Sequence, residues 1–189
     1  EHDYPFEFTT EASVNLADDT NLLEAMTAAN FVGVFVGIES HDNDTLIAMR
    51  KKQNTRRSLV DSIHRIYAAG MFVHAGFIVG FDTEKSAVAD TMIDLIEDAA
   101  IPVCMVGLLY ALPNTQLTRR LEREGRLYPE PAVVPKGNVD QCTHGLNFDT
   151  LRPKQDILLD YKRVLETIYD PVAFAGRLRR LAGLLDNSR

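Results

Sequence analysis

Cysteine is scarce in this chain of 189 residues, which contains only Cys104 and Cys142. The two do not form a Cys-x-x-Cys pair, so the sequence supports neither a disulfide framework nor a zinc site. The five histidines lie without His-x-x-x-His or Glu-x-x-His spacing, which argues against a histidine metal site. This usage is typical of a reducing compartment, and we expect a cytoplasmic protein with no metal ligands in this chain.

Long hydrophobic runs and an excess of positive charge are also lacking. The longest apolar run covers residues 31–38, far short of the ~20 residues that a membrane-spanning helix needs, and no signal-peptide pattern opens the chain. Lys and Arg total 20 against 27 Asp and Glu, which gives a formal charge of −7. Because nucleic-acid phosphates usually attract the opposite balance, we expect no nucleic-acid partner and no transmembrane segment.

Two familiar catalytic loops are absent as well. The sequence contains no Gly-x-Ser-x-Gly nucleophile motif and no Gly-x-x-x-x-Gly-Lys phosphate loop, which excludes those enzyme classes. Four stretches rich in aromatic and β-branched residues do occur, and a segment with helical periodicity follows each. They begin near Phe6, Val32, Phe72 and Val103. This alternation predicts an α/β fold with a parallel sheet.

Polar residues mark where the helices are expected to begin, because their side chains cap free backbone N–H groups. The expected capping residues are Asp18, Thr55, Thr83 and Thr115. Three prolines interrupt the pattern soon after residue 127. We therefore predict a partial barrel over residues 1–127, a linker or loop over 128–152 and a helical C-terminal extension over 153–189.

The last helix of the extension is expected to begin at Asp170-Pro171, a capping residue followed by proline at the first helical position. Its leucines recur at helical spacing and are expected to face inward. The arginines between them are expected to face solvent: Arg177, Arg179 and Arg180.

Ligands of a parallel βα array bind where the strands end and the loops begin. The second strand ends in Glu39-Ser40, a carboxylate and a hydroxyl able to hydrogen-bond a ligand diol. The pattern equally allows Ser40 to cap a following helix while Glu39 faces solvent. Near the end of the first strand, Thr10 and Glu11 offer a second carboxylate that could bind an ammonium group or act as an acid or base.

Two glycines, Gly76 and Gly80, flank Ile78 in the third strand. Glycine weakens a strand unless something approaches its backbone closely, so the pair indicates a flat group against the sheet, or tight packing of a helix on it. The fourth stretch runs to Leu112-Pro113, which could wall a pocket or form only a turn. The basic residues 50–52 could attract a carboxylate or complement a helix C-terminus.

These strand ends resemble the catalytic domain of radical S-adenosylmethionine (SAM) enzymes, in the branch that often carries a cobalamin-binding domain. The segment from Gly76 to Thr83 resembles the Gly-x-Ile-x-Gly motif, whose isoleucine packs on the SAM adenine. The segment Val36–Ser40 resembles the strand end that meets the SAM ribose. Further similarity lies in the segments 106–115, 124–127, 146–148 and 167–171.

The resemblance implies an incomplete parallel (β/α) barrel, a partial TIM barrel that holds strands three to six of six, with a helical C-terminal extension. It implies that the chain contacts SAM and has no catalytic residue of its own. The implied SAM-binding residues are Thr10, Glu11, Glu39, Ser40, Gly76, Ile78, Gly80, Leu112 and Pro113. The family's Cys-x-x-x-Cys-x-x-Cys motif is absent, so the ligands of a [4Fe–4S] cluster, and a domain for cobalamin if it is used, would lie outside this chain.

The implied activity is that of a fragment of an enzyme that reductively cleaves SAM and starts methyl transfer or a ring-forming oxidation on a small-molecule substrate. An electron-donor protein would serve the whole enzyme, and the chain alone is expected to be inactive. Two other interpretations stay open: a non-catalytic half-barrel that binds a ligand or partner, and part of a barrel lyase or aldolase. Exposed strand edges would favour self-association.

Overall fold

A computed structural model describes residues 6–40, 58–84, 88–129 and 145–186 of the chain. Its centre is a parallel sheet of four strands in the order β1-β2-β3-β4. The strands are β1 Phe8–Ala12, β2 Phe31–Glu39, β3 Phe72–Val79 and β4 Val103–Leu108. Strands in chain order with helices between them confirm the α/β partial barrel predicted from the sequence.

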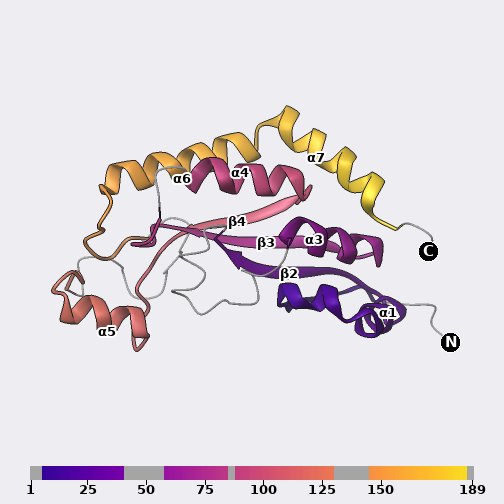
Figure 1. Cartoon of the computed structure of the whole chain (residues 1–189), viewed down its shortest axis with the longest axis horizontal. Coiled ribbons are helices and arrows are strands. Elements are labelled where there is room, and N and C mark those ends of the chain that lie inside the picture. The colour runs from indigo at the N-terminus through magenta and orange to yellow at the C-terminus, as the bar shows by residue number, and fades with distance from the viewer. Residues whose placement is uncertain (1–5, 41–57, 85–87, 130–144, 187–189) are drawn as a thin grey trace.

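Helices connect the strands and continue beyond the last one. They are α1 Thr20–Ala28, α3 Leu59–Ala68, α4 Val88–Asp98, α5 Gln116–Arg123, α6 Lys154–Ile168 and α7 Pro171–Leu184, with a short 3₁₀ helix at Val14–Asp18. Figure 1 shows α4, α6 and α7 along one side of the sheet, whereas α5 stands beyond the carboxyl ends of the strands. None of the described helices is long and apolar enough to cross a membrane.

The helix starts follow part of the capping chemistry expected from the sequence. The residues directly before α4 lie outside the described part of the chain, so the cap expected at Thr83 stays a prediction. The predicted caps by Thr115 on α5 and Asp170 on α7 are confirmed, since each side chain accepts backbone N–H groups of its helix. The prediction of Asp18 was wrong, because the 3₁₀ helix takes up that residue and Asp19 caps α1. Ser58 caps α3, and Thr55 lies outside the described residues.

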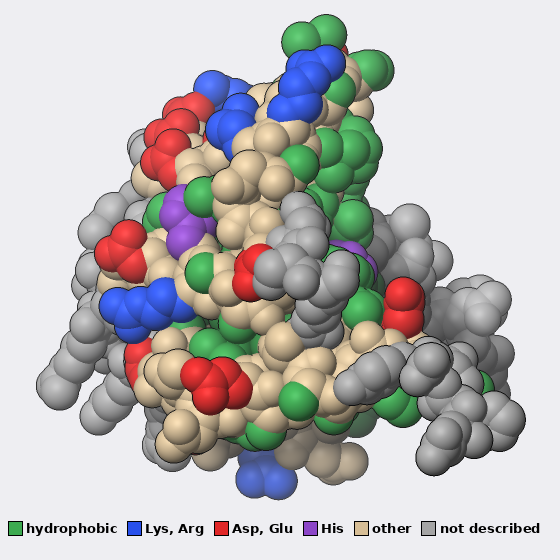
Figure 2. Space-filling view, turned by 90° about the vertical axis from the view of Figure 1, so that its right-hand side faces the viewer, with side chains coloured by type: hydrophobic (Ala, Val, Ile, Leu, Met, Phe, Trp, Pro, Cys, Tyr) green, Lys and Arg blue, Asp and Glu red, His purple; other side chains and the backbone are tan. Residues whose placement is uncertain are grey.

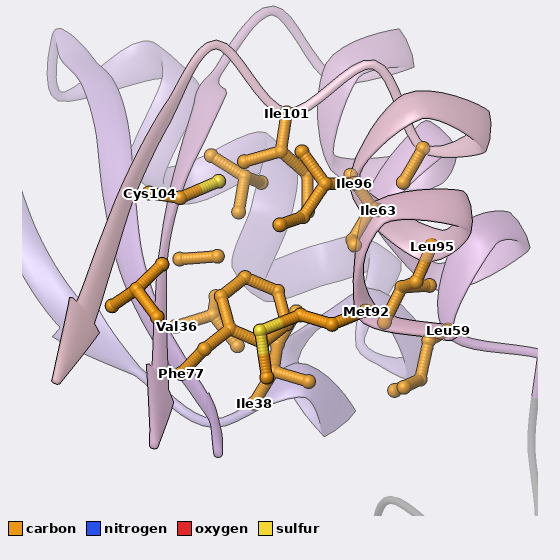
Figure 3. Packing of buried hydrophobic residues seen from close by; sticks show 14 of the residues in the cluster. Val36, Ile38, Leu59, Ile63, Phe77, Met92, Leu95, Ile96, Ile101 and Cys104 are labelled. Carbon is orange, nitrogen blue, oxygen red and sulfur yellow. The ribbon is translucent and has the colours of Figure 1, made fainter. Parts of the chain in front are cut away.

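The hydrophobic core lies between the sheet and its helices. Alternate residues of β2, β3 and β4 point toward the helices, as Figure 3 shows for Val36, Ile38, Phe77 and Cys104. On the other face of β4, Met105 is 57% exposed. Within the described part of the chain, the sheet therefore has one face packed on helices and one open face, which is the arrangement of a barrel wall.

Helices α6 and α7 are fastened to the barrel by Arg177, which is fully buried, so the prediction that it faces solvent was wrong. Its Nε donates to the Ile101 carbonyl at 3.0 Å, and its Nη2 donates to the carbonyl of Ile168 at the end of α6. Its Nη1 lies 2.5 Å from Glu97 Oε1, which belongs to α4. The arginine satisfies carbonyl groups that the ends of these elements leave free.

Other basic side chains near this junction remain at the surface. Figure 2 shows them gathered at the upper end of its face, over α7 and next to acidic ones. Arg180, an exposed residue of α7, pairs with Glu97 at 2.5 Å. The predicted division at residues 127 and 152 stays a prediction, and most of the expected linker lies outside the described residues.

Replacing Arg177 by methionine should lower the free energy of unfolding by about 3 kcal/mol, because the carbonyls of Ile101 and Ile168 would stay buried without donors. Arg179→Met, at an exposed position of the same helix, should change it by less than about 0.5 kcal/mol. Urea unfolding of both variants checks this. Equal stability of the two variants would contradict the role assigned to Arg177.

Candidate functional site

The parallel register brings three of the predicted residues to one edge of the sheet. Glu39 pairs with Phe77 of β3, the residue before Ile78, and Ile78 pairs with Gly107 of β4. Gly80 follows directly after β3. Glu39, Ile78 and Gly80 therefore lie at the carboxyl ends of adjacent strands, where ligands of parallel sheets bind.

The end of β2 has an unusual backbone. Glu39 has a φ of 69°, a left-handed conformation that non-glycine residues seldom adopt, and the register with β3 shifts beside it. Ser40 is completely buried, and its N–H donates to the Ile38 carbonyl at 2.9 Å. The helix that Ser40 was alternatively expected to cap falls outside the described residues, as does the basic stretch 50–52.

Gly76 makes room for a side chain of the neighbouring strand. A Cβ atom on Gly76 would lie 2.8 Å from Cζ of Phe35, so the Phe35 ring occupies this space on the open face of the sheet. Ile78 projects from the same face and is half-buried. Here the glycine admits an aromatic ring rather than a helix, which is a third explanation that the sequence did not suggest.

The loop after β3 is held by buried polar contacts. Gly80 has a φ of 114°, and its N–H donates to both carboxylate oxygens of Glu84 at 2.9 Å. Arg152 lies 3.5 Å from the same carboxylate and reaches Asp160 of α6 at 2.5 Å. Burial raises the pKa of Glu84 to about 7 despite these hydrogen bonds and the nearby cation.

Asp82, in the same loop, binds the segment that follows α5. Both of its oxygens accept from Arg126, at 2.6 and 2.9 Å, and Arg120 adds a contact at 2.8 Å. Burial acts to raise the pKa of Asp82, but the hydrogen bond and charge of Arg126 and the charge of Arg120 outweigh it and lower the pKa. The loop is thus tied to α5 through Arg120 and to the segment after it through Arg126.

Asn147 holds the chain where it leaves β4. Its amide accepts from the Ala111 N–H at 2.8 Å and donates to the Ala111 carbonyl at 3.1 Å. The neighbouring Leu146 donates its N–H to the Leu109 carbonyl at 2.7 Å, and its side chain fills the space beside Gly80. The predicted residues Leu112 and Pro113 directly follow this clamp, but both are exposed.

A pocket of about 790 Å³ opens beside this edge. Two predicted residues, Ile78 and Leu112, line it together with side chains of α5 and of the loop after β3. Pro113 lines a second pocket of about 570 Å³ on the side of Asn147. Concave sites of this volume suit small organic ligands.

Thr10 and Glu11 are not brought to this edge. They lie in β1 beside Val34 and Phe35, several residues before the end of β2. Glu11 therefore shares a row across the sheet with Phe35 and His74 rather than with Glu39 or Ile78. Both residues are exposed on the edge strand.

The residues present do not fit an iron–sulfur cluster. Cys104 is buried, and burial raises the pKa of its thiol to about 12, far from the thiolate that binds iron. Cys142 lies outside the described residues. Within the described ranges, no three His, Cys, Asp or Glu side chains are grouped to hold a metal ion.

Sequence reasoning assigned no role to Asn147, Glu84, Arg126 or Arg152. The segment 146–148 contributed to the family resemblance, but nothing in its composition indicated which backbone it would contact. All four side chains contact residues of another loop or element, and Glu84 also accepts from Gly80 within its own loop. The local signal in the sequence was the position of Glu84 four residues after Gly80, close enough for its carboxylate to accept the glycine N–H.

Asn147→Ala should lower the free energy of unfolding by about 2–4 kcal/mol, because the N–H and carbonyl of Ala111 would both lose their buried partner. Asn21→Ala, at an exposed position of α1, should change it by less than about 0.5 kcal/mol. Thermal or urea unfolding measures both. A loss at Asn147 no larger than at Asn21 would show that the clamp contributes nothing.

The raised pKa of Glu84 has a consequence for stability. Between its ordinary value of 4.5 and about 7, the folded protein binds more protons at this site than the unfolded chain does, so stability falls as pH rises. Glu84→Gln keeps an acceptor for the Gly80 N–H. It should remove the part of the fall in unfolding free energy with rising pH that Glu84 causes. Urea unfolding across pH 4.5–8 measures this, with Glu122→Gln, an exposed matched change, keeping the original profile. If unfolding free energy depends on pH in Glu84→Gln as it does in the parent protein, the raised pKa of Glu84 is refuted.

Comparison with known proteins identifies a family model and several proteins that this chain resembles. Residues 115–189 match a family described as a domain of unknown function (DUF4070). An uncharacterized methyltransferase of Synechocystis sp. is 46% identical over 94% of this chain, and a hopanoid C-2 methylase of Rhodopseudomonas palustris is 32% identical over 92%. The chain spans about a third of the length of these curated relatives, 32% and 31% respectively.

The fold also has a counterpart among solved structures. A cobalamin-dependent SAM radical enzyme, OxsB, determined with aqua-cobalamin bound, matches with a TM-score of 0.50 at 13% identity. The match covers 87% of this chain and 29% of OxsB. Both curated relatives are named for methyl transfer, and OxsB has the fold. These findings confirm the resemblance to radical SAM enzymes of the cobalamin-binding branch that the motifs indicated.

Proposed function

We propose that this chain is the part of a radical SAM methyltransferase that holds the adenosyl portion of SAM. The observation that carries the proposal is the position of Ile78, which projects from the open face of β3 and lines the pocket shared with Leu112. An isoleucine and a leucine at the mouth of a parallel sheet offer apolar contact to a flat heterocycle. The names of the curated relatives support methyl transfer as the reaction.

Different residues would contact the adenine and the ribose of the nucleoside. Ile78 and Leu112 contact the adenine, while Gly80 turns the chain at the strand end with a φ of 114°. Glu39, on the adjacent strand, accepts hydrogen bonds from the ribose hydroxyls, since its carboxylate lies at the same edge. Ser40, Gly76 and Pro113 shape the surrounding backbone. The proposal does not rest on Thr10 or Glu11, which pair with Val34 and Phe35 several residues before the end of β2.

The chemistry of the reaction comes from outside this chain. SAM supplies the radical and the methyl group when it is bound beside a reduced [4Fe–4S] cluster, with cobalamin as a methyl carrier. The chain itself binds and orients the nucleoside and contributes one wall of the substrate cavity. The ion pairs of the buried Glu84 and the half-buried Asp82 keep that wall fixed.

Truncating Ile78 tests the assignment in the full-length enzyme. Ile78→Ala should raise the dissociation constant of SAM about tenfold, because it removes apolar contact with the adenine. Ile93→Ala is the matched control, since Ile93 is equally half-buried against the core but lies on α4, away from this edge. Equilibrium titration with SAM measures the dissociation constant of both variants. If both lose affinity equally, Ile78 does not contact the nucleoside.

A further inference from the structure

The pocket beside Ile78 contains more than the proposed nucleoside site. It extends from the ends of β3 and β4 along α5, and its apolar lining includes residues that are not assigned to the nucleoside. This lining consists of Ile78, Phe81, Leu109, Leu112 and Leu117. Polar side chains occupy only part of its boundary. Such a pocket suits a ligand with an apolar body.

Three arginines of α5 line the same pocket, and they differ in their partners. Arg120 is neutralised by Asp82 at 2.8 Å and by Glu124 at 3.7 Å. Arg119 and Arg123 contact only backbone carbonyls, those of Asn114 and Arg119, at 3.4 and 3.1 Å. Within the described residues neither has a carboxylate partner, so two guanidinium groups bring uncompensated charge to the pocket in a chain whose net charge is −7.

Other donors converge on the same space. Tyr110 lines the pocket, and its hydroxyl has no hydrogen-bond partner among the described residues. Gln116, in the first turn of α5, adds an amide. Guanidinium and hydroxyl donors at the margin of an apolar surface match a carboxylate or phosphate joined to a hydrocarbon body.

We propose that this pocket binds an amphiphilic organic anion, with its apolar body against Phe81, Leu109 and Leu117 and its acidic group on Arg119 and Arg123. The inference rests on the proposed function, because a ligand placed beside the nucleoside would be the molecule that the enzyme methylates. A small molecule fits better than a protein surface, since the apolar residues line a concavity of about 790 Å³ rather than a flat face.

The test compares anionic and neutral probes of equal length on the full-length enzyme. Decanoate and decyl phosphate carry the two acidic groups, and decanamide is the neutral control. Isothermal titration should show at least one anion binding about tenfold more tightly than decanamide, and the difference should shrink with added salt. Whichever anion is preferred identifies the acidic group. Equal affinity for both anions and decanamide would overturn the inference.

Paired substitutions locate the binding site. The double variant Arg119→Gln/Arg123→Gln should lose the preference for the anion and keep the affinity for decanamide. The matched control Arg163→Gln/Arg179→Gln removes the same charge from exposed positions of α6 and α7 and should keep the preference. Retained preference in the first double variant would also overturn the inference.

SAM titration of the same variants separates this inference from the proposed function. The Arg119→Gln/Arg123→Gln variant should bind SAM as the parent does, because neither residue is assigned to the nucleoside. Loss of SAM affinity in that variant would show that the guanidinium groups serve SAM and would refute a separate anion site. If Ile78→Ala leaves the dissociation constant of SAM unchanged while the anion still binds, only the nucleoside assignment is refuted.

Discussion

The attachment of residues 145–148 to the ends of β3 and β4 is the contact on which the candidate site depends. Asn147 replaces, for Ala111, the backbone partners that a further strand would supply. Leu146 closes the space that Gly80 leaves open, and its N–H continues the ladder from Leu109. Without this segment, the ends of the two strands would present unpaired polar groups where the pocket now lies.

Buried and half-buried arginines extend this attachment across the molecule. Arg126 and Arg152 reach the loop after β3 from segments on either side of residues 130–144, and Arg177 reaches the start of β4 from α7. Each spans two parts of the chain, so the C-terminal helices are part of the barrel's structure. Figure 1 shows the result, a sheet with α6 and α7 along one side. The family match over residues 115–189 includes most of these contacts.

The sequence predicted what depends on local patterns. Strand positions follow from apolar runs such as residues 31–38, and the caps at Thr115 and Asp170 follow from side-chain chemistry next to a helix. Local sequence patterns did not predict the contacts between segments that are distant along the chain. Arg177 follows the same spacing as its exposed neighbours, and only the carbonyls of Ile101 and Ile168 make its burial favourable. Likewise, Phe35 beside Gly76 depends on strand register, which periodicity does not give.

Hydrogen–deuterium exchange of the full-length enzyme, with and without SAM, tests most directly whether this edge of the sheet holds the nucleoside. The account predicts that SAM slows exchange in peptides that cover residues 78–84 and 109–113, and leaves peptides from α1 unchanged. Exchange that is unaffected at both strand ends, while SAM protects other parts of the enzyme, would contradict it.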